Sequence, residues 1–192
     1  MIKEVKSMKY RREIALKNGE TLLLRSLCAQ DAEETLRVLK KTAGETGFMM
    51  RYENEWNVTT QQEREALAQT ASAPKSLMLG AFVDGRLVGA ANFRPVHPGD
   101  RARHRAGMGL SVLKAHWGKG IGTALIQALI DAARTTALEQ LELSVMSQNT
   151  RAKALYTRLG FAEYGRLPRA IKHRDGTYDE LILMLLDLRR RA

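Results

Sequence analysis

The stretch HWGKGIG, residues 116–122, places three glycines in seven positions, directly before a run of alanines and leucines. Apolar residues then recur at helical spacing for more than three turns from Ile121. When a chain passes through glycines into a helix, the first helical N–H groups lack intrahelical partners and lie at the positive end of the helix dipole. Glycines also let an anion approach the backbone without meeting a Cβ. The stretch therefore predicts a phosphate-binding turn, with an ordinary helix start as the alternative.

Other glycine-rich motifs fit this turn less well. No Lys-Ser or Lys-Thr pair follows Gly122, so the spacing is not that of a P-loop. A dinucleotide-binding turn belongs near the start of a βαβ unit, whereas this turn lies past the middle of the chain, after a hairpin pattern. Lys119 adds a cation close to the glycines. Phosphate binding by backbone N–H groups remains the favoured interpretation.

Strand and helix patterns alternate on either side of the turn. Apolar or alternating runs predict strands at 22–24, 77–83, 86–93, 106–113 and 141–145, and two more around Asp175-Gly176. Asp84-Gly85 is typical of a two-residue hairpin turn between the second and third of these strands. Helical spacing predicts helices at 29–41, after an N-cap hydroxyl at Thr59 or Thr60, from Ile121, and at 150–159. This order predicts a single α/β (α+β) domain, with a mixed, mostly antiparallel sheet of six or seven strands, one parallel crossover and about four helices.

Length and charge narrow the classes of protein. A chain of 192 residues is expected to form one domain, here residues 20–192 after a basic N-terminal extension at 1–19. No apolar stretch reaches the length of a membrane span, the start lacks a secretory signal, and Cys28 is the single cysteine, so we expect a cytoplasmic protein. The net charge of +10 includes two basic clusters, one near the start (Lys3, Lys6, Lys9, Arg11 and Arg12) and one at the end (Arg189, Arg190 and Arg191). These terminal clusters lack interleaved aromatics, which disfavours nucleic acid as the partner.

The turn and a second segment together resemble the GNAT superfamily of N-acetyltransferases, whose acetyl-CoA signature is [QR]-x-x-G-x-[GA] after the fourth strand. Gly120, Ile121 and Gly122 match its last three positions, and Trp117 stands where Gln or Arg is expected. The segment NTRAKALYTRLGF, residues 149–161, is similar to the family pattern N-x-x-A-x-x-L-Y-x-x-x-G-F. The resemblance covers residues 20–188 and implies a GNAT-like domain whose fourth and fifth strands splay apart.

The resemblance also implies roles for individual residues. The pantetheine arm of acetyl-CoA would lie between the splayed strands against Leu110, Ser111 and Val112, with the N–H of Val112 near the thioester oxygen. Tyr156 would be the general acid that protonates the departing thiolate, although its position in an apolar stripe also fits a core residue. The pyrophosphate would lie on residues 117–123, that is, on Trp117, Gly118, Lys119, Gly120, Ile121, Gly122 and Thr123. Asn149, at the start of the next helix, would contribute to the same site or act as an N-cap.

The base that accepts the proton of the amine is open. Many relatives use a glutamate on the fourth strand, but HRAGMGLSV, residues 104–112, offers no carboxylate. His104 is one candidate, with a solvent-facing loop histidine as the alternative. Glu53 and Glu55 form a second candidate pair, and Asp179 and Glu180 could orient a cationic acceptor.

The resemblance therefore implies an acetyl-CoA-dependent N-acetyltransferase that acts on a primary amine by direct transfer in a ternary complex. The alternative is a basic binding protein that keeps the fold and engages nucleic acid or an acidic partner without catalysis. No metal is expected, because the four histidines are scattered without ligand spacing. The identity of the acceptor amine is open, and a homodimer is common among members of the superfamily.

Overall fold

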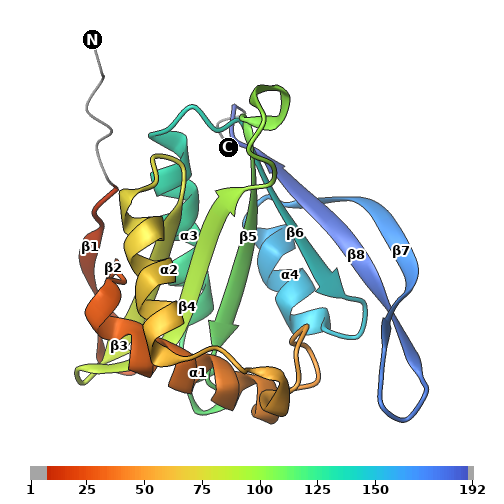
Figure 1. Cartoon of the computed structure of the whole chain (residues 1–192), viewed down its shortest axis with the longest axis horizontal. Helices are drawn as coiled ribbons and strands as arrows, with labels where there is room; N and C mark the ends of the chain where they lie inside the picture. Colours follow the sequence, from red (N-terminus) through yellow and green to blue (C-terminus); the bar gives the residue numbers. More distant parts are fainter. Residues whose placement is uncertain (1–7, 190–192) are drawn as a thin grey trace.

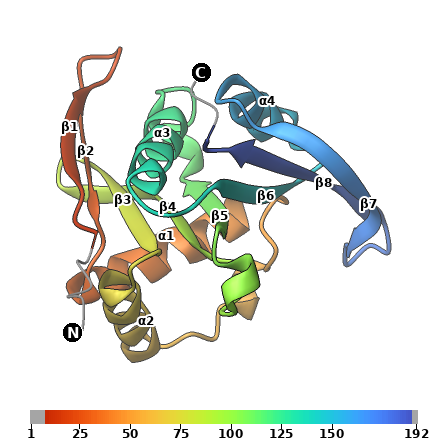
Figure 2. The same ribbon diagram turned by 90° about the horizontal axis from the view of Figure 1, so that it is seen from above.

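Helix α3 (Ile121–Arg134), which follows the glycine turn, packs on one face of an eight-stranded sheet (Figures 1 and 2). The computed structural model describes residues 8–189. Its strand order is β1-β2-β3-β4-β5-β6-β8-β7, and β5 and β6 form its one parallel pair. The strands are β1 (Arg11–Ala15), β2 (Thr21–Ser26), β3 (Leu77–Val83), β4 (Arg86–Pro95), β5 (Arg105–Val112), β6 (Gln140–Met146), β7 (Ala162–Lys172) and β8 (Tyr178–Asp187).

The helices cover both faces of this sheet. Helices α1 (Ala32–Glu45) and α2 (Thr60–Ser72) lie on one face, and α3 and α4 (Thr150–Arg158) lie on the other (Figure 2). The Thr59 side chain accepts a hydrogen bond from the Gln62 N–H, so α2 has the predicted N-cap. The predicted single α/β domain with four helices and a mostly antiparallel sheet is confirmed.

The sheet has one strand more than the six or seven predicted, and the additional strand is β1. It pairs with β2 in antiparallel register, Ile14 opposite Leu22, at the outer edge of the sheet. Its sequence, RREIA, is charged and mostly exposed, so hydrophobic alternation gave no signal. Residues 11–15 of the predicted extension at 1–19 are therefore part of the sheet. The basic residues Lys3, Lys6, Arg190 and Arg191 lie outside the described residues.

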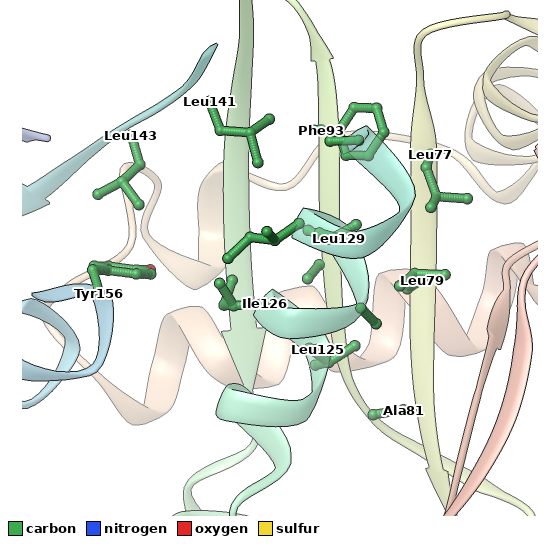
Figure 3. Packing of buried hydrophobic residues seen from close by; sticks show 14 of the residues in the cluster. Leu77, Leu79, Ala81, Phe93, Leu125, Ile126, Leu129, Leu141, Leu143 and Tyr156 are labelled. Atoms are coloured by element: carbon green, nitrogen blue, oxygen red, sulfur yellow. The ribbon is translucent and has the colours of Figure 1, made fainter. Parts of the chain in front are cut away.

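The main core lies between α3 and the sheet. Leu125, Ile126 and Leu129 of α3 are fully buried against side chains of β3, β4 and β6, as Figure 3 shows. Full burial of a leucine or isoleucine side chain stabilises a fold by about 1.5–3 kcal/mol. This packing fixes α3, and its N-terminus is thereby held at the end of β5.

Strands β5 and β6 diverge after a short paired segment. Their parallel register covers only residues 105–107 and 140–142. Across this paired segment, the Arg105 guanidinium donates two hydrogen bonds to the Glu142 carboxylate, one of them from Nη2 to Oε2 at 2.8 Å. Because the unpredicted strand β1 shifts the numbering by one, the strands predicted as fourth and fifth are β5 and β6. The predicted splaying of these two strands is thus observed.

Replacing Glu142 by glutamine is expected to lower the free energy of unfolding by about 1 kcal/mol at neutral pH, because the two-point ion pair with the partly exposed Arg105 is lost. The hydrogen bond from Arg105 lowers the pKa of Glu142. Because the carboxyl pKa is lowered in the folded protein, the ion pair stabilises the fold above the ordinary glutamate pKa, and this stabilisation is lost as the pH falls. Urea denaturation of both proteins at about pH 7 and pH 3 measures this. Glu139→Gln, at an exposed pair, is the control, and an equal destabilisation at both pH values would contradict the assignment.

Candidate functional site

The gap between β5 and β6 exposes unpaired backbone groups. The Leu113 N–H donates to the Val88 carbonyl of β4 at 2.9 Å. Because N–H groups alternate in direction along an antiparallel pair, those of Leu110 and Val112 point away from β4 and into the gap. Across the gap, the Ser147 N–H donates to the Glu180 backbone carbonyl of β8 at 2.9 Å. Because the backbone groups alternate in direction along β6 as well, the N–H and carbonyl of Ser144 point away from β8 and into the gap. The gap can pair with an extended ligand that carries amides.

The residues predicted on β5 divide between the two edges of the strand. The backbone of Ser111 pairs with Ala90 of β4, so it is the buried side chain of Ser111 that faces the site. The predicted backbone contacts of Leu110 and Val112 remain compatible with the structure, whereas that of Ser111 is not, because its N–H and carbonyl face β4.

Trp117 closes one end of this gap. Its indole Nε1 donates a hydrogen bond to the Val112 carbonyl at 2.7 Å. The guanidinium of Arg151, at the start of α4, lies over the indole ring, 5.2 Å from its centre. Trp117 therefore satisfies the last carbonyl of the strand, while the neighbouring Val112 N–H is left facing the gap. This gives Trp117 a structural reason to stand where the family signature has Gln or Arg.

The glycine turn leaves room for an anion. Gly118 and Gly120 have φ angles of +83° and +87°, the left-handed region that glycine adopts at little cost. A Cβ at Gly120 would meet no atom within 4 Å. The first intrahelical bond of α3 is from the Ala124 N–H to the Gly120 carbonyl, so the N–H groups of residues 121–123 have no partner in the helix. Open space beside free N–H groups fits a phosphate group.

The cations at this turn differ from the prediction. The Lys119 ammonium pairs with the Glu20 carboxylate at 2.9 and 3.0 Å, and hydrogen bonds from Asn18 and Lys119 lower the pKa of Glu20. Lys119 is therefore paired with a residue 99 positions away, and it is not among the residues that line the cavity at the turn. Arg151 and Arg158 of α4 instead line the cavity at the turn.

Two cavities meet beside α4. The glycine-turn cavity, of about 280 Å³, extends from Trp117 and Gly120 towards Tyr156. The splay cavity, of about 380 Å³, lies between β5 and β6 and continues under the loop before α2. The residues common to both linings include Leu110, Ser111, Asn149, Ala152 and Tyr156. A ligand in one cavity and a ligand in the other would thus meet at these side chains.

Tyr156 lies at this junction with its ring packed in the core. It is 7% exposed, and the ring of Phe161 contacts it edge to face, with the centres 5.9 Å apart. The Asn149 side chain accepts a hydrogen bond from the Ala152 N–H at 3.2 Å and so caps α4. Burial raises the pKa of Tyr156 to about 12. The phenol is therefore protonated at any physiological pH and can donate a proton or a hydrogen bond to a ligand.

The predicted base candidates are not brought together with Tyr156. His104 lies just before β5, beyond its paired end, where its carbonyl accepts from the Glu139 and Gln140 N–H groups, and it lines neither cavity. Glu53 and Glu55 belong to an exposed turn outside both cavities.

Asp179 and Glu180 are also engaged elsewhere. Asp179 lies 3.1 Å from the His173 ring, and Glu180 accepts from Arg166 at 2.8 Å. Among the described residues, no aspartate, glutamate or histidine lines the splay cavity.

The loop at 46–58 contributes residues that sequence analysis missed. Arg51 and Trp56 line the splay cavity, next to the expected Glu53 and Glu55. The loop is tied to the β7–β8 turn, because Arg174 donates to Asn54 at 2.6 Å and its guanidinium lies over the Tyr52 ring. This contact joins residues 120 positions apart, and no periodic pattern in the loop signalled it.

Two absences hold for residues 8–189. No helix there is long and apolar enough to cross a membrane. No cluster of three or more His, Cys, Asp or Glu side chains suited to a metal ion is present in that part of the chain.

Comparisons with known proteins agree with this geometry. Residues 43–161 match the family model described as Acetyltransferase (GNAT) family. A crystal structure of a GNAT-family acetyltransferase from Streptococcus pneumoniae superposes with a TM-score of 0.84 at 27% identity, covering 86% of this chain and 99% of that one. A probable N-acetyltransferase of Bacillus subtilis is 27% identical over 175 residues, which are 88% of this chain and 96% of the relative.

A further relative is named for its substrates. The L-methionine sulfoximine/L-methionine sulfone acetyltransferase of Pseudomonas paraeruginosa is 29% identical over 112 residues. The matched stretch covers 58% of this chain and 64% of that relative, which is less than two thirds of its length.

Proposed function

The chain belongs to the GNAT acetyltransferase family, and we propose on that basis that it transfers an acetyl group from acetyl-CoA to a primary amine by direct transfer in a ternary complex. The observation that carries the proposal is that Tyr156 lines both cavities. One cavity ends in a turn whose free N–H groups fit an anion, and the other is open to a second ligand. A proton donor at the junction of two ligand sites is the arrangement that direct transfer requires.

The glycine-turn cavity fits acetyl-CoA by its chemistry. The free N–H groups of residues 121–123 and the guanidinium of Arg151 would hold the pyrophosphate. The backbone edges of Leu110 and Ser144 would pair with the amides of the pantetheine arm. When bound, acetyl-CoA supplies the thioester that is the acetyl donor. Lys119 is left out of this site because Glu20 holds its ammonium.

Two groups of the chain would act on the reacting atoms. The Val112 N–H, kept free while Trp117 takes the Val112 carbonyl, would donate to the thioester oxygen as negative charge develops there. The Tyr156 hydroxyl would donate its proton to the sulfur of the leaving thiolate. Both donors are fixed in place by a strand and a helix before substrate binds.

The amine would lose its proton without help from a carboxylate or histidine of the splay cavity. Among the described residues, none of these side chains lines it. The attacking amine would therefore transfer its proton to water at the open mouth of the cavity. His104, which lies just before β5 and lines neither cavity, takes no part in the proposed reaction.

The acceptor class has support from a relative. The relative from Pseudomonas paraeruginosa is named for methionine sulfoximine and methionine sulfone, both amino-acid-like amines. An amino-acid-like amine is accordingly the proposed acceptor of this chain.

Calorimetry and turnover together test the proposed function. With about 100 µM protein, titration with acetyl-CoA is expected to show binding with a Kd in the micromolar range. Release of free CoA is then expected on addition of a mixture of amino acids and small amines. Absence of acetyl-CoA binding would overturn the proposal, and binding without CoA release from any amine would favour a non-catalytic role for the fold.

A further inference from the structure

The splay cavity has an unusual balance of charge for a site that receives an amine. Amines carry positive charge in water at neutral pH, and a site that binds an ammonium is expected to offer carboxylates. The one ionised side chain among the described residues of its lining is Arg51, a cation. The nearby carboxylates of Glu53 and Glu55 lie outside the lining, and those of Asp179 and Glu180 face His173 and Arg166. The cavity therefore repels a second positive charge on the acceptor.

Arg51 has no counter-ion within residues 8–189. Two arginines on the β7–β8 side have polar partners: Arg166 contacts Glu163 and Glu180, and Arg174 donates to Asn54. The guanidinium of Arg51 instead lies over the ring of Trp56, 5.2 Å from its centre, and makes no ion pair with a described residue. A guanidinium has five donors in a fork that matches a carboxylate.

Trp56 adds an independent observation. It lines the same cavity, and its indole Nε1 is buried without a hydrogen-bond acceptor in the described part of the chain. A buried donor without a partner costs free energy, so native proteins usually pair such groups with protein, water or ligand. The Arg51 side chain is exposed and the Trp56 Nε1 is buried, and neither has an acceptor among the described residues. A carboxylate that enters beside the indole would supply acceptor oxygens for both.

Apart from the polar side chains of Asn92, Ser111, Ser144, Asn149 and Tyr156, the rest of the lining is apolar. Its apolar part includes the side chains of Leu39 and Phe48 and those of five methionines, Met49, Met50, Met78, Met108 and Met146. Methionine is flexible and polarisable and adapts to apolar groups of different shape. A charged side chain of the acceptor would lose its hydration here without gaining a partner.

We propose that the acceptor is an α-amino acid with an uncharged, apolar side chain, and that Arg51 and Trp56 bind its carboxylate. This inference rests on the proposed acetyl transfer and specifies its second substrate. The carboxylate would lie at the wall formed by Arg51 and Trp56, the side chain among the methionines, and the amine towards Tyr156. Proximity of a guanidinium and an apolar lining also favours the neutral amine, the form that attacks a thioester.

Four matched amines test the recognition of the carboxylate. L-leucine carries the carboxylate and an apolar side chain, L-leucinamide has the same amine beside a neutral amide, isoamylamine lacks the carboxyl group, and cadaverine carries two amines. We expect kcat/KM to be highest for L-leucine, and lower by about 10- to 100-fold for the amide and for isoamylamine, the range of a lost charge-assisted hydrogen bond. Cadaverine is expected to be the poorest acceptor.

Variants at Arg51 assign the effect to its charge. Arg51→Ala is expected to raise KM for L-leucine by about tenfold or more, and to leave KM for L-leucinamide and for acetyl-CoA within about twofold. Arg51→Lys, which keeps the charge, is expected to recover part of the loss for L-leucine. Arg64→Ala, an exposed arginine of α2 outside both cavities, is the matched control and is expected to change none of these values.

The outcomes separate this inference from the proposed function. A preference for L-leucinamide or cadaverine over L-leucine, or an equal rise of KM for leucine and its amide in Arg51→Ala, would overturn the carboxylate site while acetyl transfer itself stands. Transfer to none of the four amines, with acetyl-CoA bound, would overturn the acceptor class. Failure to bind acetyl-CoA would instead overturn the proposed function.

Discussion

Replacing Tyr156 by phenylalanine is expected to lower kcat by about 100- to 1,000-fold, while KM for acetyl-CoA changes by less than about twofold. The phenylalanine ring keeps the contact with Phe161 and the burial in the core, so only the hydroxyl is lost. That hydroxyl has no hydrogen-bond partner among the described residues, and its removal should leave the free energy of unfolding within about 0.5 kcal/mol. The defect is then one of proton donation to the thiolate.

The pH dependence of the wild-type enzyme follows from the same burial. A pKa raised to about 12 keeps the phenol protonated over the whole working range, so ionisation of Tyr156 does not reduce activity below about pH 11. In the proposed reaction the leaving thiolate would lie beside the same buried ring, which would raise the pKa of its thiol as well. Because no described Asp, Glu or His lines the splay cavity, we expect kcat/KM to rise with pH until the amine of the acceptor is itself deprotonated.

Steady-state and single-turnover kinetics measure these effects. Tyr164→Phe, which removes the hydroxyl of an exposed tyrosine on β7, is the matched control and should be indistinguishable from wild type. An unchanged single-turnover rate for Tyr156→Phe would remove Tyr156 from the proposed chemistry. A fall in rate centred near pH 10, absent from the Phe variant, would show that the phenol is less desolvated than its burial indicates.

Most of the fold could be predicted from local patterns. The hairpin at Asp84-Gly85 has positive φ at both residues, as such a turn requires, and the Thr59 cap lies where its hydroxyl predicted it. Strand β1 could not be predicted, because RREIA has no alternation and is held by backbone pairing with β2. A charged edge strand gives no hydrophobic signal, yet it completes the sheet.

Only those parts of the candidate site that lie within one short segment of the sequence could be predicted. The glycine turn depends on local backbone geometry that a short motif indicates, and so does the cap at Asn149, which is one of the two roles predicted for that residue. The partner of Lys119 is Glu20, 99 residues away and just before β2, and Trp56 reaches the splay cavity from a loop without periodicity. Charge pairing and cavity lining are set by tertiary packing, which residue spacing does not encode.

Replacing Gly120 by aspartate is expected to raise the Kd for acetyl-CoA by about 100- to 1,000-fold. The open space where the Cβ of residue 120 would lie adjoins the free N–H groups of α3. An aspartate at this N-cap position would accept hydrogen bonds from those N–H groups and place a negative charge beside the proposed site of the pyrophosphate. Like charges about 4 Å apart repel by about 4 kcal/mol at the effective dielectric constant near a protein surface, which is the upper end of the expected loss.

Gly120→Asn separates this charge from backbone strain, because asparagine has nearly the same shape, caps a helix and tolerates positive φ. It is expected to weaken binding by about tenfold, and the difference between the two variants should shrink as salt is added. Gly176→Asp, at a glycine with φ of +85° and open space in the β7–β8 turn, controls for strain and added charge away from the site. Equal binding by the Asp and Asn variants at low salt would mean that the phosphate groups do not lie on this turn, since a full negative charge at residue 120 cannot be neutral towards a neighbouring pyrophosphate.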